Sequence, residues 1–191
     1  MRSPTRTLAT FPKVHNLFLS CPALKRVKLG SKNAPSGITL LENCAIANCK
    51  NIEYLELGAG IDSLCDNSLN DLDNLKVLIS WATVPPRCNS YWDAFSGPKP
   101  EEMDAIVYVP KASVEAYRTA NEWKNFKTIV GIEDVGDING SGAIDIADVT
   151  GLIDQVLAGE IVNPAIADVD FDGMVGISDV TGLIDKILSG N

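Results

Sequence analysis

Apolar residues recur at an interval of 23 along the first half of the chain. The interval relates five pairs of apolar positions: Leu41 and Leu64, Ile46 and Leu69, Cys49 and Leu72, Ile52 and Leu75, and Leu55 and Leu78. An earlier half-copy, residues 21–29, aligns with residues 49–57. A unit of this length cannot bury its apolar side alone. The pattern therefore predicts stacked repeats, each with one short strand, such as residues 54–57, and an irregular or helical return.

The interval and its leucines resemble the leucine-rich repeats of the surface-protein type, found in secreted proteins of anaerobic bacteria. Residues 81–126 fit the C-terminal end that is usual in that family. A helix over residues 111–123 would place Val114, Tyr117 and Trp123 on one side and cap the open end of the stack. Two full repeats and a fraction are fewer than the three or so that such a stack needs, so we expect the chain to belong to a longer protein.

A second repeat, with a period of 31 residues, occupies the C-terminal part of the chain. Residues 146–159 and 177–190 agree at ten of fourteen positions, and their Val, Leu and Ile spacing predicts a helix in each. Each helix follows a twelve-residue loop, residues 137–148 or 168–179. Both loops have oxygen-bearing side chains at positions 1, 3, 5 and 12 and glycine at position 6. The regular apolar spacing argues against a disordered acidic tail.

This arrangement of oxygens predicts two calcium sites, that is, two Ca2+ ions. Calcium takes six to eight oxygen ligands, which a twelve-residue loop can wrap around the ion, with a backbone carbonyl at position 7 and a sharp turn at the glycine. The predicted ligands are Asp137, Asn139, Ser141, Ala143, Asp145 and Asp148 in the first loop, and Asp168, Asp170, Asp172, Met174 and Asp179 in the second. The alternative, an acidic surface turn, does not explain two loops in register. At position 8, Ile144 and Val175 are candidates for a short β-bridge between the loops.

About eight residues, including Pro164, separate the first helix from the second loop and leave no room for a helix entering that loop. Duplicated loop-helix units with Asp148 and Asp179 at position 12 resemble a type I dockerin, a module that docks secreted proteins to a β-sandwich partner called cohesin. The resemblance covers residues 136–191. It implies a partner-facing set in each unit: Ile146, Ala147, Ile153, Asp154 and Ala158, and Ile177, Ser178, Ile184, Asp185 and Ser189.

Two features of the predicted helices allow more than one interpretation. Ile153 and Ile184 suit packing between the two helices as well as contact with a partner. Gly151 and Gly182 lie in mid-helix, where each costs about 1 kcal/mol relative to alanine. Close approach of the two helices is our preferred reason for these glycines, ahead of close approach of a partner.

Together these features predict the fold class and the division of the chain. We expect an α/β leucine-rich-repeat solenoid with a C-terminal capping helix over residues 1–130. A linker over residues 131–136 would join it to a small all-α dockerin-like domain of two loop-helix calcium units, residues 137–191.

Charge is distributed unevenly along the chain. The net charge is −9, and residues 131–191 hold twelve acidic residues but one basic residue, Lys186. Repulsion among these carboxylates predicts that the segment is loosely folded until cations bind. The negative charge and the lack of a basic stripe disfavour nucleic acid as a partner. No stretch approaches the ~20 apolar residues that span a bilayer, so we expect no membrane span.

The sequence offers little for catalysis or redox chemistry. His15 stands alone, and paired carboxylates lie mostly in the two loops, so we expect no enzyme and assign no catalytic residue. Five cysteines fit a disulfide framework poorly. Cys21 and Cys49, at equivalent repeat positions, are expected to be small core residues, while a pairing of Cys44 with Cys65 stays open.

Localisation and function follow from the two resemblances. Residues 1–20 contain no apolar run of signal-peptide length, yet calcium loops and both families imply an extracellular or cell-surface protein that has lost its signal by truncation or processing; a cytosolic protein is the alternative. In one hypothesis the C-terminal module docks a cohesin-like protein domain while the repeats bind an unknown protein or glycan ligand. In the other the module is an intramolecular stabilising cap, and the chain is an adhesin.

Overall fold

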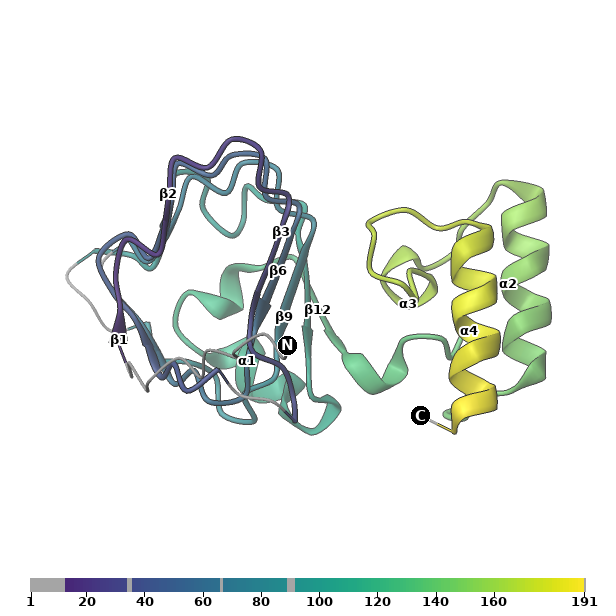
Figure 1. The fold of residues 1–191 in the computed structure, drawn as a ribbon. Helices are drawn as coiled ribbons and strands as arrows, with labels where there is room; N and C mark the ends of the chain where they lie inside the picture. Colours follow the sequence, from purple (N-terminus) through teal and green to yellow (C-terminus); the bar gives the residue numbers. More distant parts are fainter. Residues whose placement is uncertain (1–12, 34–35, 66, 89–91, 191) are drawn as a thin grey trace, which may run out of the picture.

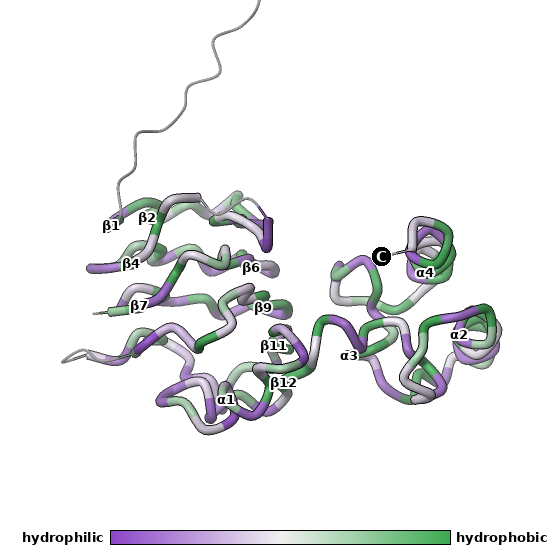
Figure 2. The backbone as a smooth tube through the Cα atoms, turned by 90° about the horizontal axis from the view of Figure 1, so that it is seen from below, coloured by the Kyte–Doolittle hydropathy of each residue, from purple (hydrophilic) through white to green (hydrophobic). Residues whose placement is uncertain are grey.

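The computed structural model describes residues 13–33, 36–65, 67–88 and 92–190. Successive coils of the chain stack on one another and give short strands to three parallel sheets (Figures 1 and 2). The three-stranded sheet has the order β1 (Lys13–Val14), β4 (Leu40–Leu41), β7 (Ser63–Leu64). The four-stranded sheet has the order β10 (Phe95–Ser96), β8 (Leu69–Asn70), β5 (Ile46–Ala47), β2 (Phe18–Leu19). The five-stranded sheet has the order β12 (Thr128–Gly131), β11 (Ile106–Val109), β9 (Val77–Ser80), β6 (Tyr54–Leu57), β3 (Arg26–Leu29).

The strand register follows the intervals read from the sequence. Leu55 pairs with Leu78, and Ile46 with Leu69, at the 23-residue offset. The earlier half-copy is also in register, because Val27 of β3 pairs with Leu55 of β6. The inward-facing residues of the coils form one hydrophobic core. We call this part of the protein, residues 13–131, the coil stack.

The predicted fold class is wrong. The described residues form a mixed α/β structure with three parallel sheets and four short α-helices, not a leucine-rich solenoid followed by an all-α domain. The return segments between β3, β6 and β9 are irregular, as expected, but two-residue strands interrupt their turns and bends. Residues such as Leu41 and Leu64 occupy equivalent places in adjacent coils, so their backbones lie within pairing distance and form additional ladders.

The expected capping helix is interrupted. Instead of one helix over residues 111–123, the chain forms η1 (Lys111–Ser113), α1 (Val114–Thr119) and η2 (Trp123–Asn125). Glu122, at a φ of 62°, lies between α1 and η2. Its carboxylate accepts hydrogen bonds from the backbone N–H groups of Ala94 and Phe95, at 3.2 and 3.1 Å. This contact between Glu122 and the preceding coil requires a turn at a position where the apolar pattern predicts that the helix continues.

The expected linker is also structured. Gly131 is the last residue of β12, and residues 132–134 form η3 (Ile132–Asp134). Ile132 and Val135 are buried. The Gly136 N–H donates a hydrogen bond to the carbonyl of Ile166 at 2.8 Å, which ties the connection to the chain between the two loops.

The C-terminal segment, residues 137–190, contains α2 (Ile146–Ala158), α3 (Pro164–Ala167) and α4 (Ile177–Ser189). Helices α2 and α4 lie side by side (Figure 1) and bury Val149, Leu152, Val180 and Leu183 between them. The single turn of α3 begins at Pro164, in the stretch where we expected no helix, because proline is tolerated at the first helical position.

This segment does not stand apart as an all-α unit. Val169 and Phe171 of its second loop pack into a cluster with Tyr54 and Tyr108 on the outer face of the five-stranded sheet. Among the described residues, no helix is long and apolar enough to cross a membrane. All five cysteines are free thiols, and Cys49 is buried in the core, as its repeat position predicts.

Candidate functional site

The two loops of the C-terminal segment share one hydrogen-bond network. In each, the carboxylate at position 1 accepts the N–H groups of positions 5 and 6. For Asp137 the distances are 3.0 and 2.8 Å, and for Asp168 both are 3.0 Å. The side-chain oxygen at position 3, from Asn139 or Asp170, also accepts the position-5 N–H. The repetition of these contacts shows that the loops adopt one conformation.

The carboxylates at position 12 anchor the loops to the helices. Asp148 and Asp179 are both fully buried. Asp148 accepts the N–H of Asn139 at 3.0 Å and that of Asp145 at 2.9 Å. Asp179 accepts the equivalent N–H groups, those of Asp170 at 3.2 Å and Gly176 at 2.8 Å. Each carboxylate thus joins the third and ninth positions of its loop to the first turn of the following helix.

Glycine makes the turn at position 6 of each loop. Gly142 and Gly173 have φ angles of 86° and 87°, in the left-handed region that glycine adopts without a steric penalty. Non-glycine residues at this position would strain the turn. The expectation that glycine is needed here is confirmed.

The side-chain oxygens of the second loop converge. Asp168, Asp170 and Asp172 present carboxylate oxygens that all lie within 4.8 Å of one another. In the first loop, Asp137 and Asn139 meet at the Ser141 N–H, and the Ser141 hydroxyl donates to the carbonyl of Ala143 at 3.1 Å. Clustered carboxylate, amide, hydroxyl and carbonyl oxygens are the donor set that calcium prefers, so the residues present fit this ion.

Two of the predicted ligands make further contacts, and one predicted feature is missing. Asp145 caps α2, since its carboxylate accepts the Ala147 N–H at 2.8 Å. The Met174 N–H, which is separate from the carbonyl predicted as a ligand, donates to the Asp172 carboxylate at 2.8 Å. The expected β-bridge between Ile144 and Val175 is not among the bridges of the described residues. Both side chains pack into the core between the helices instead.

The carboxylate of Asp168 lies in an environment that disfavours its charged form. Asp168 is 2% exposed. Burial raises its pKa to about 6, and the charges of Asp179 and Asp170 act in the same direction, while the N–H groups of Gly173 and Asp172 oppose the rise. A divalent cation between these carboxylates would favour their charged forms.

The ten residues that the dockerin resemblance assigns to partner contact are all exposed: Ile146, Ala147, Ile153, Asp154, Ala158, Ile177, Ser178, Ile184, Asp185 and Ser189. Ile153 and Ile184 are not among the residues of the apolar core between α2 and α4, which disfavours the helix-packing interpretation of these two residues. Sequence reasoning missed Leu157 and Leu188, which follow Ile153 and Ile184 by four residues and therefore share their helix face.

The exposed apolar faces of α2 and α4 are equivalent. Ile146 and Ile177 are each 72% exposed, Ile153 and Ile184 are 36% and 37% exposed, and Leu157 and Leu188 are 81% and 80% exposed. Three large apolar side chains on each helix are therefore left to solvent in the same way. Exposed apolar residues gathered on one surface mark interaction sites more often than isolated ones do.

The mid-helix glycines do not serve close helix approach. A Cβ atom on Gly151 would meet Ile138 Cγ2 at 3.5 Å, and one on Gly182 would meet Val169 Cγ1 at 3.5 Å. These are ordinary contacts with position 2 of each helix's own loop. Our preferred interpretation of the glycines is therefore wrong, because a methyl group fits at both positions.

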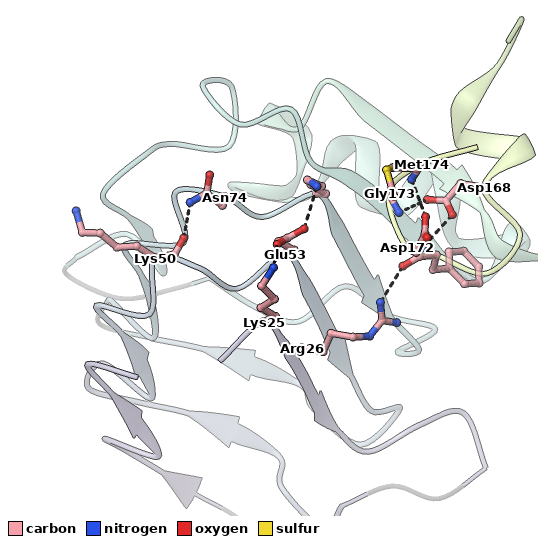
Figure 3. A network of polar contacts seen from close by, with 11 residues as sticks. Lys25, Arg26, Lys50, Glu53, Asn74, Asp168, Asp172, Gly173 and Met174 are labelled. Carbon is pink, nitrogen blue, oxygen red and sulfur yellow. Dashed lines mark hydrogen bonds and ion pairs between the residues drawn. The ribbon is translucent and has the colours of Figure 1, made fainter. Parts of the chain in front are cut away.

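The second loop also contacts the coil stack, in line with the hypothesis of an intramolecular cap, through residues that the sequence did not single out. The Phe171 ring lies edge-on to the Tyr108 ring, with centroids 4.8 Å apart. The Phe171 carbonyl accepts a hydrogen bond from Arg26 Nη1 at 3.2 Å (Figure 3), and the Arg26 guanidinium lies 3.9 Å from the centre of the Tyr54 ring. The available signal was an aromatic residue at position 4, where the first loop has Gly140.

A cleft of about 970 Å³ lies where the sheet, the connection and the C-terminal segment meet. The coil stack lines it with Tyr54, Glu56 and Trp81, and the segment with Phe171 and Lys186. Glu56 accepts hydrogen bonds from the Trp81 indole at 2.8 Å and from the Tyr54 hydroxyl at 2.7 Å. The carboxylate thereby fixes the aromatic wall of the cleft.

No protein-family model matches the chain, and no curated protein matches its sequence.

Proposed function

We propose that this protein is a non-enzymatic, extracellular assembly component whose C-terminal segment binds two Ca2+ ions and docks a cohesin-like protein domain. The observation that carries the proposal is the repetition of one loop conformation in both calcium-loop patterns, followed in each case by a helix with the same exposed apolar face. The resemblance of the sequence to a type I dockerin supplies the class of partner. The coil stack would carry a second ligand, a protein or a glycan.

Calcium has a structural role in this proposal. Each ion would hold a loop against the first turn of its helix, where Asp148 and Asp179 are buried. The helices would then be fixed relative to each other through Leu152 and Leu183. Their exposed faces become a rigid surface, which lowers the entropic cost of binding a partner.

Because the exposed apolar faces of α2 and α4 are nearly the same, either helix could form the main contact with the partner. Substituting one face alone should therefore weaken binding only in part. The diagnostic variant replaces Ile153 and Ile184 together with arginine, which places charge on both faces while leaving the calcium loops and the core between α2 and α4 untouched.

The experiment is a titration of the full chain against a panel of purified type I cohesin domains, with calcium and with chelator. We expect calcium-dependent binding to at least one domain and its loss in the Ile153→Arg/Ile184→Arg double variant. The control is Val84→Arg, because Val84 is equally apolar and 73% exposed but lies on the coil stack. No binding to any domain, or equal loss in both variants, would contradict the docking function.

The contact between Phe171 and Tyr108 favours a second candidate function. It supports a role for the segment as an intramolecular cap of the coil stack, in which case the stack would be the adhesive part of a cell-surface protein. In that case the double arginine variant has no effect on ligand binding, whereas Phe171→Ala lowers the unfolding temperature of the stack.

A further inference from the structure

The two calcium loops differ in what surrounds them. The first loop is largely exposed, and its position 4 is Gly140, beside which there is open space. The second loop places Phe171 at this position, at a φ of 58°, with its ring against Tyr108. The internal repeat is therefore broken at the residue that meets the coil stack.

The sheet surface that receives the second loop is built for contact. Strands β6 and β9 are buried on both faces, as strands of parallel sheets usually are. Tyr54, Val77, Ile79 and Tyr108 form the apolar outer cluster, and Val169 and Phe171 pack against it. The Lys76 ammonium donates a hydrogen bond to the Glu53 carboxylate at 2.9 Å (Figure 3), and the Lys76 side chain lies against Gly173 of the loop.

One polar atom in this contact lacks a partner. The Tyr108 side chain is fully buried, and its hydroxyl has no hydrogen-bond partner among the described residues. A buried hydroxyl without a partner is unfavourable. The contact is therefore held by the packing of Phe171 and Val169 on the sheet and not by this hydroxyl.

We propose that calcium in the second loop fastens the C-terminal segment to the five-stranded sheet through the packing of Phe171 and Val169. This inference rests on the proposed calcium binding. Calcium orders the loop, the ordered loop presents Phe171 and Val169 to the sheet, and the sheet in turn favours the calcium-bound loop. The first loop has Gly140 in place of Phe171, so this link is proposed for the second ion alone.

The test uses hydroxyl-radical footprinting of the full chain, which reports the solvent accessibility of individual tyrosine side chains. Tyr108 and Tyr117 are both fully buried, but Tyr117 lies in the cap of the coil stack, where Ser80 and the Ala82 carbonyl hold its hydroxyl. With calcium both tyrosines are expected to be protected. With chelator Tyr108 becomes reactive, while Tyr117 stays protected as the internal control.

Two matched variants separate the loops. Asp168→Asn, in the second loop, should expose Tyr108 even in calcium, whereas Asp137→Asn, at the same position of the first loop, should leave it protected. Phe171→Ala keeps every predicted ligand and should lower calcium affinity at one of the two sites by at least about fivefold, the lower end of usual coupling between sites. Val162→Ala, at an apolar position that is 81% exposed and precedes the same loop, should not.

Calorimetric titration that finds no calcium binding overturns the proposed function and this inference with it. Two bound ions with Tyr108 equally protected with and without calcium overturn the inference alone.

Discussion

Asp179 accepts a hydrogen bond from the backbone N–H of Asp170, across nine residues of the second loop, at 3.2 Å. The same carboxylate accepts the N–H groups of Val169 and Gly176, at 2.7 and 2.8 Å. Removing it leaves three backbone donors without an acceptor beside a helix start. Because the group is fully buried, no water replaces it.

We therefore predict that Asp179→Ala lowers the free energy of unfolding of α4 by at least about 1–3 kcal/mol, even in chelator. Thermal unfolding followed by circular dichroism measures this change. Glu160→Ala is the matched control, since that carboxylate is exposed and is expected to shift the midpoint very little. Equal midpoints for the two variants would show that the buried carboxylate does not organise the loop.

Calcium removal should loosen the C-terminal segment and spare the coil stack. A ligand that binds only the folded state adds about 2.7 kcal/mol per site at a hundredfold excess over its dissociation constant. We expect two unfolding transitions in chelator, with the one that loses helix content at the lower temperature. A single transition at one midpoint, with and without calcium, would contradict this prediction.

Substituting the mid-helix glycines with alanine should stabilise the protein. Gly151→Ala and Gly182→Ala each gain about 1 kcal/mol from helix propensity, because the added methyl groups meet neighbours only at 3.5 Å. Gly136→Ala is the contrasting variant, since its φ is 100° and its Cβ would lie 2.8 Å from Leu183 Cδ1. Chemical unfolding in calcium measures all three. Loss of stability in the first two would reveal a close approach that the structure does not contain.

Glu56 gives the coil stack a pH-dependent contribution. Burial opposes its charged form, but hydrogen bonds from Trp81, Tyr54 and Lys28 outweigh burial and lower its pKa below the usual value. A lowered pKa means that the stabilisation is present above the unfolded-state pKa and is lost as pH falls through the folded-state pKa. Glu56→Gln should therefore cost about 1.5–3 kcal/mol at pH 7 and less in acid. A cost that does not change with pH would contradict the role of the charge.

The strand register of the coils and the glycine turns of the two loops could be predicted from the sequence, because both depend on patterns within one repeat. Leu55 meets Leu78 since the same apolar position recurs 23 residues later. The glycines of the loops were assigned from turn geometry alone. Two-residue strands such as Leu40–Leu41 could not be foreseen, because they are too short to show an alternation of apolar and polar side chains.

The contact between the coil stack and the C-terminal segment could not be predicted residue by residue from the sequence, because it joins residues that only the fold brings together. Phe171 looks like an exposed loop residue until β11 places Tyr108 beside it, 63 positions away in the chain. Likewise, Glu122 ends a helical pattern only because Ala94 and Phe95 of another coil need an acceptor. Helix propensity and apolar periodicity contain no information about contacts between residues that lie far apart in the sequence.

The most direct test of the central claim is a crystal structure of the full chain grown in excess calcium. We predict one ion in each loop, with the oxygens of Asp137, Asn139 and Asp148, or of Asp168, Asp170 and Asp179, at about 2.3–2.6 Å. Loops that hold no ion at saturating calcium would contradict the account.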